Sequence, residues 1–262
     1  MLYFPQLSSG AVAQYPVRKQ SVQRTVVNQL ADGRNVKLAD YSAAYFAWQL
    51  QFVDLSDSEM GTLQQFWASS EGQLNAFTFL DPTDNLFTWS ESLGQPSWQA
   101  SPLLQLTTGI DDASGGQRAT RIMNNSGADL TIQQAINGPG WFSYCFSVYV
   151  RSQSASTVSL FQQSGSAASS SVAGTSSSWS RASLGSRLQT TSGSLTAGVV
   201  IRAGQTIDLF GCQLEPQPAA STYKQTFSVG GVHTSAHFSD DTFEVTTSAP
   251  NRSRCTVGIT AR

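Results

Sequence analysis

Residues 88–218 of this sequence consist of short runs of alternating apolar and polar residues separated by turn residues, and this pattern limits how they can fold. The alternation has the two-residue period of a strand with one buried face, and helical periodicity is almost absent. Short strands at such spacing predict a two-sheet sandwich of the jelly-roll type. We expect strands at 103–107, 119–123, 129–134, 142–151, 157–161, 178–183, 198–202 and 206–214, and an exposed loop over the Ser/Ala/Gly-rich residues 164–178.

The first 87 residues begin with the pattern of a β-hairpin. Residues 24–30 and 36–38 favour strands, and Asp32-Gly33 between them suits a tight turn, because both residues tolerate positive φ. Residues 45–53 alternate over part of their length and predict a separate, long, half-buried strand.

One helix is expected in this region, over residues 57–70. Ser56 and Glu59 have the spacing of a capping box, in which each side chain bonds the other residue's backbone N–H. Gly72 can end the helix in a left-handed conformation. Residues 75–80 predict a further strand.

The last segment, 219–262, is too short to form an independent domain. It predicts a hairpin of 227–229 with 232–238, and strands at 243–247 and 255–260. We expect these strands to complete the sheet that residues 1–87 begin, so that 88–218 is an insertion. The predicted fold class is therefore mainly β: a discontinuous β-sandwich with one α-helix (1–87 and 219–262) and an inserted jelly-roll β-sandwich (88–218).

Charge and cysteine content exclude several classes of protein. Charged residues make up 12% of the chain and its net charge is -2, so it is not a strongly basic nucleic-acid binder. No apolar run approaches the roughly 20 residues of a membrane helix, and the N-terminus has no signal-peptide pattern, so we expect synthesis in the cytoplasm without export. Cys145, Cys212 and Cys255 are far apart and are expected to be buried thiols.

The sequence carries no catalytic fingerprint. It has no nucleophile elbow and no phosphate-binding loop, so we expect no enzymatic activity. Asp111 and Asp112 could supply oxygen ligands to a structural Ca²⁺, although a turn explains them as well. His233 and His237 would share one face of a strand, but they lack a third ligand at a persuasive spacing. We therefore expect no cofactor apart from that Ca²⁺.

Tryptophans are the most informative side chains of the insertion. Sugars present apolar faces that pack on aromatic rings, so Trp98, Trp141 and Trp179 are candidate glycan-binding residues. The alternative for each of them is a place in the core.

Three stretches of the flanks together resemble phage tail proteins of the distal tail type, from siphophages and gene-transfer-agent-like particles. The stretches are residues 4–16, residues 55–86 with their Phe-Leu-Asp-Pro-Thr run, and residues 230–241. The resemblance covers about half of the chain, namely the two flanks. It implies a homo-hexameric ring at the tail tip of the virion, in contact with tail tube, tail hub and tape-measure proteins, with a lumen that passes DNA without binding it specifically.

The insertion is similar to jelly-roll carbohydrate-binding-like modules of phage tails and head spikes. The similarity rests on 85–91, Trp98, 115–121, 147–151, 179–181 and 213–223, which includes a strand that ends in Glu215 before Pro216. It implies a domain that faces outward and binds host surface polysaccharide, although no residue stands out as a sugar ligand. Two alternatives to a ring subunit remain open: a glycan-binding host-recognition adhesin and a polysaccharide-degrading enzyme.

Overall fold

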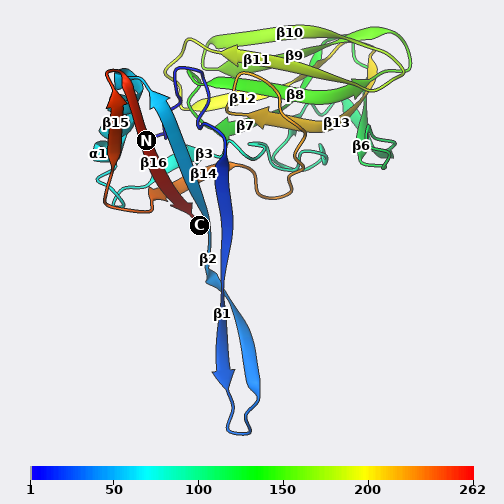
Figure 1. Ribbon diagram of the computed structural model, residues 1–262. Coiled ribbons are helices and arrows are strands. Elements are labelled where there is room, and N and C mark those ends of the chain that lie inside the picture. The colour runs from blue at the N-terminus through cyan, green and yellow to red at the C-terminus, as the bar shows by residue number, and fades with distance from the viewer. Residues whose placement is uncertain (1) are drawn as a thin grey trace. The chain divides into compact units, whose positions relative to one another are not determined.

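A computed structural model describes residues 2–262, which form β-strands and a single α-helix (Figure 1). The chain divides into two compact units. The first contains residues up to Leu7, Ala13–Phe79 and His233–Arg262, and the second contains Ser8–Val12 and Leu80–Val232. The mainly β fold class is confirmed. The central segment runs from Leu80 to Val232 and is therefore longer at both ends than the predicted insertion of residues 88–218.

The first unit is built on a sheet whose order, among the described residues, is β1-β2-β16-β14-β3, with β15 beside β16. Because β16 lies between β2 and β14, the end of the chain completes a sheet that its beginning started. The strands are β1 (Val17–Gln29), β2 (Asn35–Leu55), β3 (Phe77–Leu80), β14 (Val232–Phe238), β15 (Val245–Ala249) and β16 (Arg252–Ala261).

The expected hairpin of 227–229 with 232–238 is wrong, because only the second half is a strand. The carbonyls of Thr226 and Phe227 accept hydrogen bonds from the backbone N–H groups of Ser90 and Trp89 instead. Residues 226–227 are therefore held by the segment that follows β3, and not by β14.

The helix α1 (Asp57–Ser69) is confirmed together with its cap. The Ser56 hydroxyl accepts from the Glu59 backbone N–H at 3.3 Å, and the Glu59 carboxylate accepts from the Ser56 N–H at 3.1 Å. This reciprocal pair satisfies two of the backbone donors that a helix start leaves open. Met60 and Leu63 are buried on its inner face.

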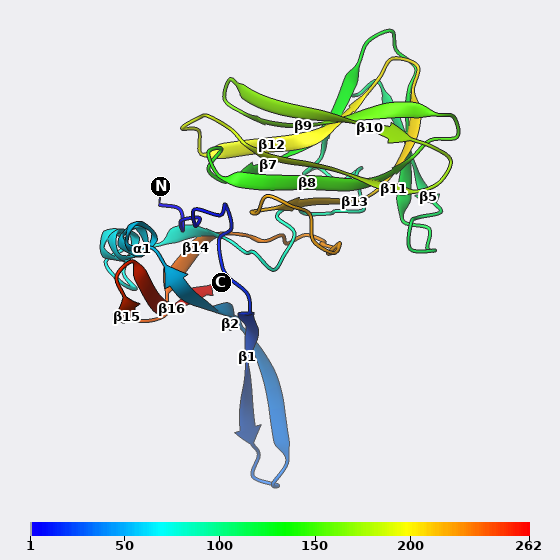
Figure 2. The ribbon, with the colours of Figure 1, turned by 45° about the horizontal axis from the view of Figure 1, so that its top comes forward.

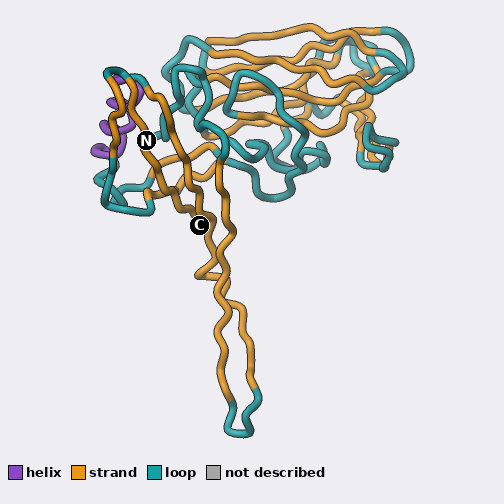
Figure 3. Tube along the Cα trace, viewed as in Figure 1, coloured by secondary structure: helices purple, strands orange, loops and turns teal. Residues whose placement is uncertain are grey.

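Strands β1 and β2 form a hairpin that is much longer than predicted (Figures 1 and 3). Residues 35–55 make one continuous strand because β1 pairs with it on both sides of residues 41–44. Strand β16 pairs with β2 only from Phe46 onward, so residues 24–29 and 35–40 pair with each other alone. We call residues 23–44 the arm; Gly33, at φ 84°, lies in its terminal turn.

The second unit is the predicted sandwich: two five-stranded sheets enclose one core (Figure 2). One sheet has the order β10-β9-β12-β7-β4 and the other, here called the front sheet, has the order β11-β8-β13-β6-β5. Fully buried Tyr144, Phe146 and Ile122 fill the space between them. The bounds are β4 (Gln99–Ala100), β5 (Leu104–Ile110), β6 (Ala119–Asn124), β7 (Leu130–Asn137), β8 (Ser143–Arg151), β9 (Ser156–Ser164), β10 (Ala167–Thr175), β11 (Ser180–Arg187), β12 (Ser194–Ile201) and β13 (Thr206–Glu215).

The Ser/Ala/Gly-rich residues 164–178 are not the predicted loop. Residues 167–175 form β10, which pairs with β9 along its whole length. It is an edge strand, and its side chains alternate between partly buried and exposed up to Gly174. Small side chains suit such an edge, where one face is only half covered, so low complexity did not prevent strand formation here.

The two ends of the central segment are joined by backbone hydrogen bonds. The Asp81 N–H donates to the Gly231 carbonyl and the Gly231 N–H donates to the Asn85 carbonyl, both at 2.8 Å. The ends of the second unit therefore lie side by side.

The three cysteines are buried free thiols, as expected. Burial raises the pKa of Cys145 and Cys255 to about 11, so both are protonated at neutral pH. None of the helices in residues 2–262 has the length and apolar character needed to cross a membrane.

Candidate functional site

The outer face of the front sheet carries several charged side chains of the second unit, among them Arg121, Arg151 and Asp208. In β8, Tyr144, Phe146 and Val148 point into the core, so the two-residue period turns Tyr149 and Arg151 outward. Polar side chains of the front sheet therefore lie on its outer face, because its inner face packs in the apolar core.

Strand register aligns three of these groups in one row. Arg121 in β6 lies opposite Asp208 in β13, which lies opposite Arg151 in β8. The Asp208 carboxylate accepts from Arg121 Nε at 2.7 Å, from Arg121 Nη2 at 3.1 Å and from Arg151 Nε at 2.9 Å. Burial by itself would raise the pKa of Asp208, but these hydrogen bonds and charges outweigh it and hold the pKa below its usual value.

Arg151 also joins the row to Trp179. Its guanidinium lies over the Trp179 ring, 4.7 Å from the ring centre, and that ring lies beside Phe210 at 6.4 Å. Such stacking fixes the planar guanidinium while leaving its outer N–H groups available.

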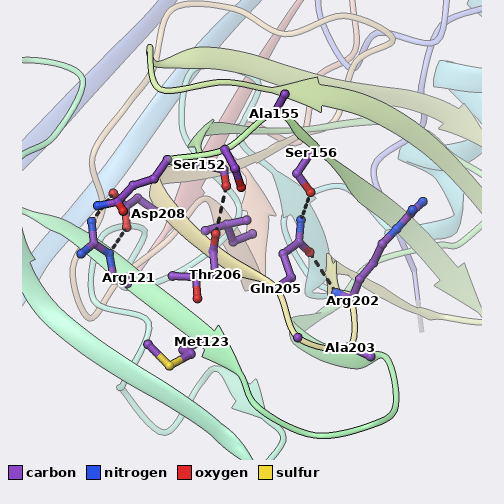
Figure 4. Close-up of a pocket in the computed structure, with 14 residues that line it drawn as sticks. Arg121, Met123, Ser152, Ala155, Ser156, Arg202, Ala203, Gln205, Thr206 and Asp208 are labelled. Carbon is purple, nitrogen blue, oxygen red and sulfur yellow. Dashed lines mark hydrogen bonds and ion pairs between the residues drawn. The ribbon is translucent and has the colours of Figure 1, made fainter.

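A groove of about 560 Å³ begins at this row (Figure 4). The Arg121–Asp208 pair lies at one end and Arg202 at the other, and between them lie Ser152, Ser156 and the strand start at Thr206. Hydroxyl and amide groups therefore line the middle, and guanidinium groups lie toward both ends.

The walls of the groove are held by hydrogen bonds. Gln205 donates to the Ser156 hydroxyl at 3.0 Å and to the Thr157 carbonyl at 2.8 Å, and it accepts from the Arg202 backbone N–H at 2.9 Å. Ser152 donates to the Thr206 carbonyl at 3.1 Å. The shape of the groove is therefore fixed by hydrogen bonds within the fold.

The chain itself covers the middle of the outer face. Residues 221–226, here called the strap, cross the front sheet. Tyr223 packs on Phe210 with ring centres 5.5 Å apart, and Lys224 pairs with the buried Glu215 at 3.0 Å. The strap does not cover the end of the front sheet that carries the groove, so this end of the outer face stays open.

Glu91 fastens the strap. Its carboxylate accepts from Arg118 at 3.1 Å, from the Tyr223 hydroxyl at 3.1 Å and from Gln225 at 2.7 Å. Burial raises the pKa of Glu91, and the Tyr223 hydrogen bond and Arg118 oppose that effect only in part. All three partners are structural, so this carboxylate has a packing role.

The three candidate tryptophans lie in different places. Trp98 is 6% exposed, donates to the Trp89 carbonyl at 3.0 Å and packs on Phe87, so it is a core residue with no ring face for a sugar. Trp141 is partly exposed just before β8, at the end of that strand opposite Arg151. Of the three, only Trp179 contacts the Arg121–Asp208–Arg151 row, through its stacking with Arg151.

At the candidate Ca²⁺ position the Asp112 carboxylate is occupied by donors. It accepts from the backbone and hydroxyl of Ser114, from the Gly116 N–H and from Arg118. These bonds outweigh burial and lower its pKa. Asp111 is exposed and lies within 3.4 Å of the Gln117 amide. The pair therefore forms a turn closed by an arginine.

The two histidines do not form a site. His233 packs against Trp48 at 4.7 Å, whereas His237 Nδ1 lies 2.9 Å from the Gln73 carbonyl. Residues 2–262 hold no group of three or more metal-ligating side chains.

Acidification is expected to destabilise the second unit through its buried carboxylates. The pKa values of Asp208 and Glu215 lie below the usual 3.8 and 4.5, so their contribution to stability is complete above those values and is lost as the pH falls toward the lowered ones. Glu91, with its raised pKa, opposes this trend because protonation removes a buried charge. The melting temperature should fall steeply below pH 3.8, and Asp208→Asn should flatten that fall; a flat profile would contradict the assignment.

Comparison with known proteins gives structural matches only. No protein-family model matches the sequence, and no curated protein matches it. Among solved structures, the CBM22-1–GH10 modules of Clostridium thermocellum xylanase 10B align with 51% of this chain and 28% of theirs, at 13% identity and a TM-score of 0.40. The C-terminal family 22 carbohydrate-binding module of Clostridium thermocellum Xyn10B aligns over 54% of this chain and 99% of its own, at 16% identity and 0.41.

A phage protein is also among the matches. The enzymatically active domain of bacteriophage CBA120 tailspike protein 4 aligns over 52% of this chain and 22% of its own, at 11% identity and a TM-score of 0.38. The matched structures thus include carbohydrate-binding modules and a tailspike domain.

Proposed function

We propose that this chain is a structural subunit of a phage tail tip, a distal tail protein that forms a hexameric ring between tail tube and tail hub. Its second unit would be an outward module that binds host surface glycan. The observation that carries the proposal is the arm of the first unit.

The arm has the properties of an interface that awaits a partner. A two-stranded hairpin alone in water is marginally stable at best. Large apolar side chains on it are nevertheless exposed: Val27 by 53%, Leu38 by 52% and Tyr41 by 87%. Seating the arm on another subunit would bury these side chains and pair or cover its strands.

Charge favours a second copy of this chain as that partner. The arm carries three basic and two acidic side chains, a net charge of +1. The rest of the first unit carries seven acidic and five basic side chains, a net charge of -2. An arm of one copy on the body of the next is a head-to-tail contact, and such contacts close into rings when the rotation allows it.

The remaining partners follow from the resemblance of the flanks to distal tail proteins. They are the tail tube protein, the tail hub and the tape-measure protein. The proposed location of this chain is the tail tip of the virion. The near-neutral chain fits a lumen that passes DNA without gripping phosphate, since tight binding needs clustered Lys and Arg.

The test compares the full chain with an arm-shortened variant. Replacing residues 23–44 by Asn-Gly joins Val22 to its register partner Tyr45 through a two-residue turn. Light scattering and electron microscopy should find hexameric rings for the full chain and monomers for the variant. Leu38→Asp should weaken the ring, while Val172→Asp, at an equally exposed site on β10, should not. A monomeric full chain, or a ring-forming shortened variant, contradicts the proposal.

A host-recognition adhesin is the second candidate, favoured by the hydroxyl-lined groove. We infer further that the groove binds without catalysis. Glycoside hydrolysis needs a protonated acid and a second carboxylate, but the one carboxylate lining the groove among the described residues, Asp208, has a lowered pKa and two arginine partners. Release of reducing ends from host polysaccharide would overturn this inference.

A further inference from the structure

We propose that the groove at the Arg121–Asp208–Arg151 row binds an anionic sugar unit of a polysaccharide, such as a uronate, through the guanidinium groups at its ends. The inference rests on the proposed glycan-binding role and names the class of glycan.

The charge balance of the groove favours an anion. Among the residues that line the groove, Arg121 and Arg202 contribute two positive charges and Asp208 contributes one negative charge. Asp208 uses two N–H groups of Arg121 and one of Arg151, while a guanidinium has five. Several donors therefore remain for a ligand.

Arg202 is the clearest sign of a ligand. Its side chain is exposed at the end of the groove, and within residues 2–262 it forms no ion pair or side-chain hydrogen bond (Figure 4). The turn that carries it is nevertheless fixed, because the Arg202 backbone N–H and carbonyl both bond Gln205. An exposed guanidinium with all of its donors open can bind a carboxylate or phosphate through two parallel hydrogen bonds.

The remaining lining suits the hydroxyl-rich part of a sugar. Ser154, Ser156 and Thr206 offer polar groups, and Met123 offers an apolar surface for a ring face. The groove volume of about 560 Å³ lies within the roughly 300–1,000 Å³ usual for small-ligand sites. Because its walls are already held by Gln205 and Ser152, little ordering opposes binding.

The test uses matched sugars and one arginine. Trigalacturonate and α-1,4-galactotriose share their linkage and differ in the carboxylates, so calorimetry on the full chain should find the acidic trimer bound about tenfold more tightly. Arg202→Gln should remove most of that difference without changing the melting temperature, because Arg202 holds nothing in the fold. Arg187→Gln, an exposed arginine outside the groove, is the control and should change the affinity little.

A glycerol phosphate polymer serves as a third probe. It distinguishes a preference for phosphate from a preference for the carboxylate of a uronate. Tighter binding of the acidic trimer that Arg202→Gln abolishes supports the inference, whereas binding of the glycerol phosphate polymer alone overturns the sugar unit as the ligand. Equal binding of acidic and neutral trimers overturns the anionic preference and leaves glycan binding standing. An array of acidic and neutral glycans on which nothing binds overturns both, while the ring is judged separately by light scattering.

Discussion

Replacing Asn85 with leucine is expected to lower the free energy of unfolding of the second unit by about 4 kcal/mol. The Asn85 side chain has no exposed surface, and its amide makes four hydrogen bonds, all to backbone groups. It donates to the carbonyls of Cys212 and Lys224 at 2.9 and 3.3 Å, and accepts from the N–H groups of Phe87 and Leu214 at 3.1 and 3.0 Å. Leucine has a similar size but cannot form hydrogen bonds, so these four backbone groups would lose their partner in the interior.

Urea unfolding followed by tryptophan fluorescence measures this change, since Trp89, Trp98, Trp141 and Trp179 lie in the second unit. The matched control is Asn125→Leu, at an exposed position, with an expected effect within about 0.5 kcal/mol. Similar midpoints for the two variants would show that the Asn85 amide does not hold β13 and the strap together.

Phe4→Ala should destabilise the first unit by about 3–5 kcal/mol. Phe4 is 2% exposed and lies among Phe66, Phe79 and Phe238, with ring centres 5.6, 5.7 and 6.4 Å away. Alanine would remove these aromatic contacts and leave a cavity between α1 and the sheet. The loss therefore adds the cost of the cavity to that of the lost burial.

Thermal unfolding followed by near-ultraviolet circular dichroism checks this expectation. Leu74→Ala is the control, because Leu74 is 69% exposed in the same unit and its loss opens no cavity. Unchanged melting of Phe4→Ala would mean that the N-terminal segment contributes nothing to the core.

Local rules predicted the elements whose cause is local. The Ser56–Glu59 cap and the Asp32-Gly33 turn are fixed by residues a few positions apart, and both are present. The alternating runs likewise predicted the sandwich. Strand β10 escaped prediction because its small residues are ordered by pairing with β9, which the local sequence does not encode.

Most of the candidate site could not be predicted from the sequence, because the pairing register of strands far apart in the chain brings its residues together. Arg121 and Asp208 lie 87 positions apart and become partners only through the pairing of β6 with β13. Trp98 and Trp179 look alike as single residues, yet one fills the core and the other stacks on an arginine. A search for arginines at outward positions of predicted strands would have singled out Arg121 and Arg151, but not their shared carboxylate.

The backbone bonds from Asp81 to Gly231 and from Gly231 to Asn85 have an evolutionary consequence. A segment whose two ends meet can be exchanged for another of different length without changing the spacing of the strands it leaves and rejoins. The second unit can then diversify by replacement of one continuous segment, while strands β3 and β14 of the first sheet keep their pairing.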